Sequence, residues 1–168
     1  CESVYKIFGD NAEKMLRDSN GLVDAQVFQD AGCVVGVNNA SFEVYQGEML
    51  VIMGLSGSGK STLLRCISRL AETTAGKIFI DGEDLLALNG KELIELRRNK
   101  MGMVFQSFAL LPHKTVLENI AFPLQVKGST TKESISRAME MVELVGLSGR
   151  ENYFPRELSG GQQQRVGI

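Results

Sequence analysis

The sequence predicts an α/β fold, with a strand, loop and helix unit in the first part of the chain and a mainly helical second part. Residues 49–53, MLVIM, form a continuous apolar run that precedes a glycine-rich loop and a stretch with helical spacing. Such a run is typical of a strand that is buried on both faces of a parallel sheet. Beyond residue 106, capping signals and helical periodicity replace the strand patterns.

Further strand patterns accompany this unit. Residues 33–44 alternate apolar and polar side chains and predict a β-strand. Residues 77–82, KIFIDG, predict a strand ended by an Asp-Gly turn, and residues 101–106, MGMVFQ, predict another apolar strand. Asn89 and Glu92, with the spacing of a capping box, predict the start of a helix. Strand and helix signals thus alternate through this part of the chain.

Helices are predicted at both ends of the chain. Residues 10–32 are polar, with scattered apolar side chains and a central Ser-Asn-Gly break, which predicts two short surface helices. In the second part, Thr115 with Glu118 and Thr130 with Glu133 predict capping boxes. Apolar side chains then repeat at helical spacing up to a glycine; they are Ile135, Ala138, Met139, Val142 and Val145.

Composition and charge narrow the classes of partner. The chain has 168 residues, 43% of them apolar, and a formal net charge of -2. It lacks the basic field that drives nucleic-acid binding, so nucleic acid is not an expected partner. No apolar run approaches the roughly 18 residues of a membrane span, and the first residues do not form a signal peptide. The sequence therefore predicts a soluble globular protein with no segment that crosses a bilayer unaided.

Several reactive or charged residues are expected to be structural. Cys1, Cys33 and Cys66 are odd in number and too widely spaced for a local metal site, so they are interpreted as ordinary thiols of a reducing compartment. His113 is expected in a loop or on the surface. The basic cluster at residues 97–100 is interpreted as a solvated helix end.

The chemistry-bearing loop is GLSGSGKS, residues 54–61, which fits the pattern G-x-x-x-x-G-K-[ST] between the predicted strand and the predicted helix. Its glycines let the main chain wrap a phosphate with the N–H groups pointing inward. Lys60 is expected over the β- and γ-phosphates of a nucleotide, Ser61 on Mg²⁺, and Thr62 near the α-phosphate. A purely structural glycine loop is the alternative. The expected nucleotide-binding residues here are Gly54, Ser56, Gly57, Ser58, Gly59, Lys60, Ser61 and Thr62.

A second motif lies at the end of the chain. Residues 158–166, LSGGQQQRV, resemble the signature sequence of ATP-binding cassette (ABC) ATPases. Ser159 is also the expected N-cap of the helix that follows. Together with the loop at Gly54 and the strand-terminal Gln106, the motif reproduces the order and rough spacing of that family over nearly the whole chain.

The resemblance implies an α/β P-loop NTPase (RecA-like) core with the helical subdomain of ABC ATPases, incomplete at its C-terminus. Residues 1–32 correspond to an N-terminal strand and aromatic loop with a helical insertion, residues 33–106 to part of the ATPase core, and residues 107–168 to the helical subdomain. The family's Mg²⁺-binding acidic strand end, catalytic carboxylate and switch histidine lie after the signature, whereas His113 precedes it. The chain is therefore expected to be a piece of a longer protein that binds nucleotide without turning it over alone.

The resemblance also assigns roles within one cassette. Gln106 corresponds to the Q-loop glutamine, which reaches Mg²⁺ and the attacking water and reports the nucleotide state to a membrane partner. Phe8 corresponds to the A-loop aromatic that stacks on adenine, which requires the insertion after it to loop out. Packing of Phe8 in the fold, or Tyr5 in its place, are the alternatives. Ser61 and Gln106 are the expected metal-binding residues.

Other roles belong to a pair of cassettes. Ser159, Gly160 and Gly161 are expected to serve the γ-phosphate that is held by the phosphate loop of a second cassette in a head-to-tail dimer. Lys60, Gln106 and Ser159 are thus the expected catalytic residues.

Longer stretches, such as residues 5–16 and 103–124, look like the ATPase subunit of bacterial glycine betaine/proline betaine importers. This likeness implies a peripheral protein on the cytoplasmic face of the membrane that uses ATP and Mg²⁺ to drive uptake of an osmoprotectant such as glycine betaine or proline. Its partners are a second ABC ATPase subunit, transmembrane permease subunits and, indirectly, a substrate-binding protein. The alternatives are a nucleotide-binding module without turnover and an ABC ATPase that acts on DNA or ribosomes.

Overall fold

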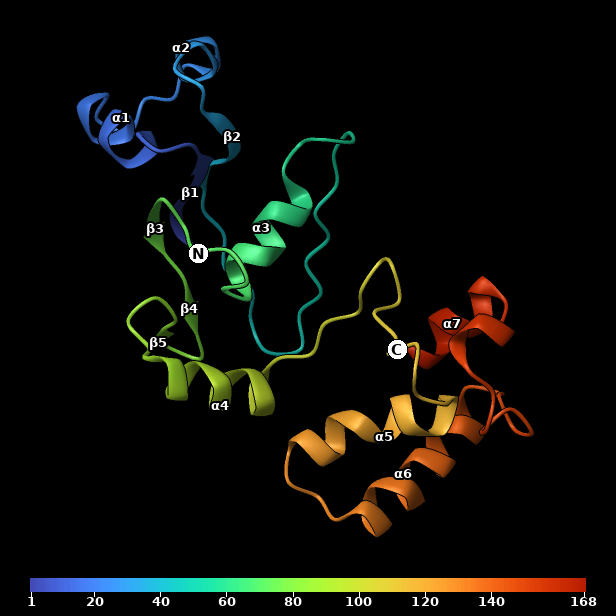
Figure 1. The fold of residues 1–168 in the computed structure, drawn as a ribbon. Coiled ribbons are helices and arrows are strands. Elements are labelled where there is room, and N and C mark those ends of the chain that lie inside the picture. Colours follow the sequence, from blue (N-terminus) through green and yellow to red (C-terminus); the bar gives the residue numbers. More distant parts are fainter. The chain divides into compact units, whose positions relative to one another are not determined.

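The computed structural model describes residues 1–168 and divides them into two compact units, Cys1–Arg97 and Arg98–Ile168 (Figure 1). The first unit contains all the strands, and the second is helical. The division falls earlier in the chain than residue 106, where the sequence patterns change. None of the helices combines the length and the apolar character that crossing a membrane requires.

The main sheet of the first unit is antiparallel. Its central strand β1 (Glu2–Phe8) lies between β2 (Val34–Ala40) and β3 (Ala75–Lys77) and pairs antiparallel with both. The short strands β4 (Phe79–Ile80) and β5 (Glu83–Asp84) form a separate hairpin around the predicted Asp-Gly turn. The parallel sheet predicted around residues 49–53 is therefore absent from the pairs that this chain makes.

Two predicted strands are wrong in this structure. Residues 49–53 and 101–106 form no strand, and their apolar side chains lie largely in solvent, with Met49 and Met53 each 86% exposed. A strand exists only where a neighbouring strand accepts and donates its main-chain hydrogen bonds, and no strand of residues 1–168 pairs with either run. The apolar pattern thus indicates side chains that favour burial, but no strand of residues 1–168 pairs with these runs and buries them.

The strand predicted at residues 33–44 is shorter than expected. β2 ends at Ala40, although Phe42 still exchanges two main-chain hydrogen bonds with Cys1. The chain then turns where the Glu48 N–H donates to the Tyr45 carbonyl at 2.9 Å.

The two helices expected before residue 33 are confirmed. α1 (Ala12–Asp18) and α2 (Ala25–Asp30) lie in the connection from β1 to β2 (Figure 1). Phe8, the last residue of β1, pairs with Val34, the first residue of β2, so the connection begins and ends at paired residues of the two strands. Side chains from the connection and β1 form one buried cluster: Ile7, Ala12, Leu16, Phe28 and Cys33. The insertion therefore loops out on its own small core.

The helix α4 (Gly90–Lys100) begins at the predicted cap. The Asn89 Oδ1 accepts from the Lys91 and Glu92 N–H groups, and the Glu92 carboxylate accepts from the Asn89 N–H. The far end of α4 was expected to be solvated, and this is wrong for Arg97.

The Arg97 guanidinium is held at the end of another helix. It donates to the Ser68 carbonyl at 3.0 and 3.1 Å and to the Arg69 carbonyl at 2.8 Å. These carbonyls lie at the C-terminal end of α3 (Lys60–Ile67), where main-chain acceptors lack helical partners and the helix dipole favours a cation. Arg97 therefore anchors the end of α3 to α4.

Replacement of Arg97 by alanine is expected to lower the free energy of unfolding by about 2 kcal/mol, because charge-assisted bonds to half-buried carbonyls are lost. Chemical denaturation of the purified chain measures this. Lys91→Ala, an exposed position on the same helix, is the matched control and is expected to change stability by less than about 0.5 kcal/mol. Equal effects of the two substitutions would contradict the anchoring role.

The second unit is a helical assembly. α5 (Val116–Val126) and α6 (Thr131–Leu144) run side by side, followed by the 3₁₀ turn η1 (Pro155–Glu157) and by α7 (Gly160–Val166) (Figure 1). Both predicted capping boxes, at Thr115 and Thr130, are confirmed. The core of the unit consists of Val116, Val142, Leu147, Leu158 and Val166.

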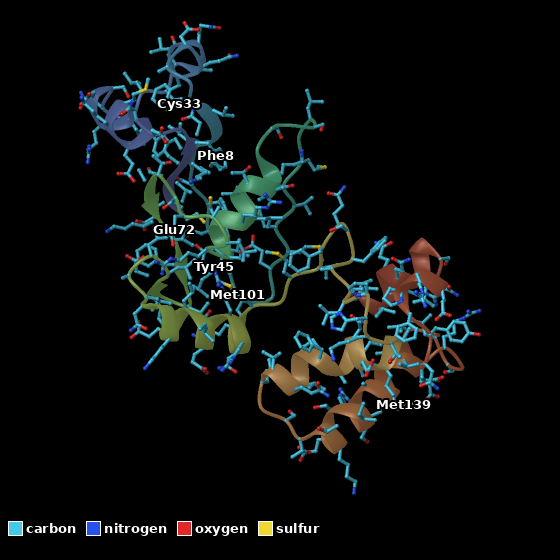
Figure 2. The ribbon with its side chains drawn as sticks, in the orientation of Figure 1. Phe8, Cys33, Tyr45, Glu72, Met101 and Met139 are labelled. Carbon is cyan, nitrogen blue, oxygen red and sulfur yellow. The ribbon has the colours of Figure 1, made fainter.

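Other expectations are settled in the same structure. His113 is exposed, as predicted, and the three cysteines are free thiols. Met139, which was assigned to the apolar face of α6, is 43% exposed (Figure 2). The buried stripe of α6 is therefore narrower than the sequence pattern and passes through Ala138 and Val142.

The capping box of α5 is expected to depend on pH. The Thr115 N–H donates to the Glu118 carboxylate at 2.7 Å, and this bond lowers the pKa of Glu118. A lowered pKa in the folded state means that the stabilisation is complete above the ordinary carboxyl pKa and is lost as the pH falls through the lowered value. The protection of the amides in the first turn of α5, taken relative to the intrinsic exchange rate at each pH, is thus expected to decrease in acid. Glu118→Gln keeps an acceptor and should remove this dependence; an unchanged acid response would contradict it.

Candidate functional site: the phosphate loop and the signature turn

The predicted loop leads directly into α3, and its shape requires glycine at two positions. Gly57 and Gly59 have φ angles of +81° and +90°, a region that side chains rarely adopt. A Cβ on Gly59 would lie 1.9 Å from the Gly36 carbonyl oxygen on β2. Gly59 is therefore the point at which the loop touches the sheet, and no other residue fits there.

The Lys60 side chain folds back across the loop. Its Nζ donates to the Gly54 carbonyl at 2.8 Å, to the Leu55 carbonyl at 2.6 Å and to the Ser58 hydroxyl at 3.2 Å. The ammonium group is thus held over the loop by neutral acceptors, with no carboxylate among these partners. Its full positive charge remains available to an anion in the loop.

The first turn of α3 supplies further donors. The Gly59 N-cap has no side chain, and the first helical bond runs from the Leu63 N–H to the Gly59 carbonyl at 2.8 Å. The N–H groups at the start of α3 therefore lack the side-chain cap that satisfies such groups in α5, α6 and α7. Uncapped amides, the positive end of a helix and a lysine are the groups with which helix N-termini bind anions.

A hollow of about 490 Å³ adjoins the loop. It is bounded by the phosphate loop on one side and by β2 on the other, and its lining includes Val35, Gly36, Val37, Gly57, Gly59 and Lys60. The uncapped N–H groups and the Lys60 ammonium group thus lie beside a partly apolar wall. This combination of groups fits a nucleotide, which carries its phosphates and its base on one molecule.

Phe8 lies close to Gly36, which lines the hollow, although Phe8 itself is not part of the lining. It lies at the end of β1 (Figure 2), and the residue is 45% exposed. The Lys6 Nζ lies 4.7 Å from the ring centroid, a cation–π contact. Tyr5, the alternative aromatic, donates its hydroxyl proton to the Gly21 carbonyl at 3.3 Å in the insertion. The geometry therefore favours Phe8 over Tyr5 as a surface for a base.

The signature turn is built as expected. The Ser159 hydroxyl accepts from the Gln162 N–H at 3.3 Å, and the Gln162 side chain accepts from the Ser159 N–H at 2.9 Å, which forms a capping box at the start of α7. A Cβ on Gly160 or Gly161 would meet nothing within 4 Å. The turn thus presents an open main-chain surface.

Gln106 and the signature turn belong to the second unit, and the phosphate loop belongs to the first. Gln106 is exposed and lies at the start of a turn in which the Phe108 N–H donates to the Phe105 carbonyl. Its approach to Mg²⁺, and that of Ser61, stay predictions. Sequence reasoning missed Gly36, because its contact with the loop arises from strand pairing and leaves no local pattern.

Comparisons with known proteins agree with these motifs. The family model described as ABC transporter matches residues 37–168. The trimethylamine N-oxide transport system ATP-binding protein TmoW of Pelagibacter ubique is 82% identical over 168 residues, which are 100% of this chain and 49% of that protein. The glycine betaine transport ATP-binding protein OpuAA of Bacillus subtilis is 50% identical over 99% of this chain and 40% of that protein. The chain spans about half the length of the curated relatives it matches.

Solved structures extend the likeness to the fold. A dimeric structure of a post-hydrolysis state of the ATP-binding cassette MJ0796 bound to ADP and Pi matches with a TM-score of 0.79 and 34% identity, over 99% of this chain and 65% of that one. A dimeric structure of MJ0796 described as a bacterial ABC transporter cassette matches with a TM-score of 0.80 and 35% identity, over 99% and 66%. The predicted P-loop cassette fold is confirmed, and these residues cover part of it. With its phosphate loop, its signature turn and this fold, the chain belongs to the ABC transporter family of ATP-binding cassettes.

Proposed function

We propose that this chain is the nucleotide-binding part of an ABC importer ATPase that drives uptake of a small methylated osmoprotectant. The observation that carries the proposal is the uncapped start of α3 beneath the Lys60 ammonium group. ATP supplies the phosphoryl group whose transfer to water releases the free energy for transport. The chain supplies the groups that bind and orient this nucleotide.

The geometry of the first unit supports the proposed roles of the phosphate loop, whereas the role proposed for Gln106, in the second unit, rests on the family resemblance. Lys60 and the main-chain N–H groups of Gly57 to Thr62 bind the phosphates, and the Ser61 hydroxyl and Gln106 bind Mg²⁺. Phe8 stacks on the adenine base. Residues 33–106 act as the partial ATPase core, residues 107–168 as the helical subdomain, and residues 1–32 as the strand and aromatic loop with its insertion.

The signature residues require a second copy of the cassette. Ser159, Gly160 and Gly161 present an exposed, uncrowded turn, as a surface that closes over a partner's phosphate must. Both MJ0796 structures are dimeric, which supports the head-to-tail pair. Transmembrane permease subunits on the cytoplasmic face of the membrane, with a substrate-binding protein outside, complete the proposed importer.

The names of the relatives support trimethylamine N-oxide, with glycine betaine as the second candidate. The sequence alone had favoured betaine or proline. The test is uptake of each radiolabelled osmolyte by the full-length protein reconstituted with its permease and binding protein in liposomes that contain ATP. ATP-dependent uptake of either methylated osmolyte supports the proposal. Absence of uptake, with ATPase activity that responds to DNA or ribosomes, would favour an ABC ATPase outside transport.

Gln106→Ala is expected to abolish uptake while changing ATP affinity less than about threefold, because one ligand of a mostly hydrated Mg²⁺ contributes little to nucleotide affinity. Uptake and ATP titration on the same reconstituted complex measure the two effects. Ser107→Ala, at the adjacent exposed position, is the control and should leave both unchanged. A large loss of ATP affinity in Gln106→Ala would contradict the coupling role.

A further inference from the structure

Gly36 on β2 is the point at which three parts of the site meet. Its carbonyl oxygen lies against Gly59 of the phosphate loop. On its other side, a Cβ built on Gly36 would lie 3.0 Å from the Phe8 ring and 3.0 Å from the Thr62 methyl group. The Phe8 ring and the first turn of α3 therefore approach the same point on β2, and the missing side chain makes room for both.

The strand pairing explains why Gly36 faces the site in this way. Lys6 pairs with Val37, and the next residue Ile7 pairs with Val35, so Gly36 has no partner on β1. One extra residue on one strand is a β-bulge, which re-aims the neighbouring groups and is frequent beside functional sites. The Gly36 carbonyl is thereby turned toward the loop while the Cα hydrogen side faces Phe8 and Thr62.

We infer that Gly36 is a positioning residue that sets the aromatic surface for the base at its correct distance from the phosphate loop. The role rests on the proposed ATP binding. It acts through Phe8: an added methyl group at residue 36 would lie 3.0 Å from both the ring and the Thr62 methyl group, which is closer than carbon atoms pack. The exposed ring at the end of β1 is expected to shift, because Thr62 is held in the first turn of α3. The surface for the base is then displaced, whereas the donors that hold the phosphates remain on the loop and on α3.

The test compares two ligands of the full-length protein, ATP and inorganic triphosphate, which lacks the base. Gly36→Ala is expected to raise the dissociation constant for ATP about tenfold, the magnitude of a lost base–aromatic stack, and to leave that for triphosphate within about twofold. Gly90→Ala is the matched control, since a Cβ there meets nothing within 4 Å. Equal losses for the two ligands, or no loss for ATP, would overturn the role of Gly36.

Two further variants keep the outcome clear. In the Phe8→Ala background, Gly36→Ala should cause no additional loss of ATP affinity, because the ring through which it acts is gone. If Gly36→Ala alone does not fold, Gly36→Ala combined with Thr62→Ser removes one of the two close methyl contacts and is compared with Thr62→Ser. Failure of the wild-type protein to bind ATP would overturn the proposed function itself, whereas normal wild-type binding with an additive Phe8 and Gly36 pair would overturn only this inference.

Discussion

Lys60→Ala is expected to abolish ATP-driven transport and to weaken ATP binding about 100-fold, which corresponds to about 3 kcal/mol for one lost charge-assisted contact. The Lys60 ammonium group is held by the Gly54 and Leu55 carbonyls and the Ser58 hydroxyl, so its charge is not neutralised within the loop. Phosphates that enter the loop replace neutral acceptors with charged ones. Calorimetric titration and uptake by the reconstituted complex measure the effect.

The fold should survive this substitution, which makes the result interpretable. Residue 60 begins α3, and alanine is the best helix former, so the helix itself is not weakened. Lys132→Ala, an exposed lysine in the first turn of α6, is the control for removal of a positive charge. Full retention of ATP affinity in Lys60→Ala, at an unchanged melting temperature, would show that the loop is structural and would contradict the proposed nucleotide binding.

A mixed dimer of two different variants is expected to recover ATPase activity that neither variant has as a homodimer. Lys60→Ala removes a phosphate-loop cation, and Ser159→Asp places a negative charge where a partner's γ-phosphate is expected while keeping an efficient N-cap for α7. Each homodimer should hydrolyse ATP at less than about 1% of the wild-type rate, as for removal of a transition-state donor. A dimer with Lys60→Ala in one subunit and Ser159→Asp in the other retains one intact composite site. It should recover about half of the wild-type rate.

The matched control places both substitutions in one subunit and pairs it with a wild-type subunit. Each composite site then contains one altered group, so this dimer should remain inactive. Differently tagged full-length subunits, purified as mixed dimers, allow the steady-state ATPase rates to be compared. Equal rates for the two arrangements would contradict a site shared between the phosphate loop and the signature turn.

The caps and the loop were predictable because they depend on neighbouring residues. The capping boxes at Thr115, Thr130 and Ser159 each close within one helical turn, and the structure contains all three. The phosphate loop likewise follows from the glycines and the lysine in a single stretch. Its expected context was only half correct, since α3 follows the loop but no strand precedes it.

Strand assignments at residues 49–53 and 101–106 failed for a physical reason. An apolar run states that its side chains favour burial, but a strand also needs hydrogen-bonding partners on a neighbouring segment. The relatives that this chain matches are about twice its length, and within residues 1–168 no strand pairs with these runs. Periodicity cannot report whether such a partner is present.

The sequence alone was thus sufficient to predict the phosphate loop and the helix caps, because their contacts join residues that are near neighbours in the chain. The family resemblance was likewise visible in short stretches of sequence. Tertiary structure decided the rest. Arg97 binds the end of α3, and Gly36 touches both the loop and Phe8, through contacts between residues that are far apart in the chain. Such contacts depend on the register in which strands pair and on which polar groups are buried against each other. No short stretch of sequence contains this information.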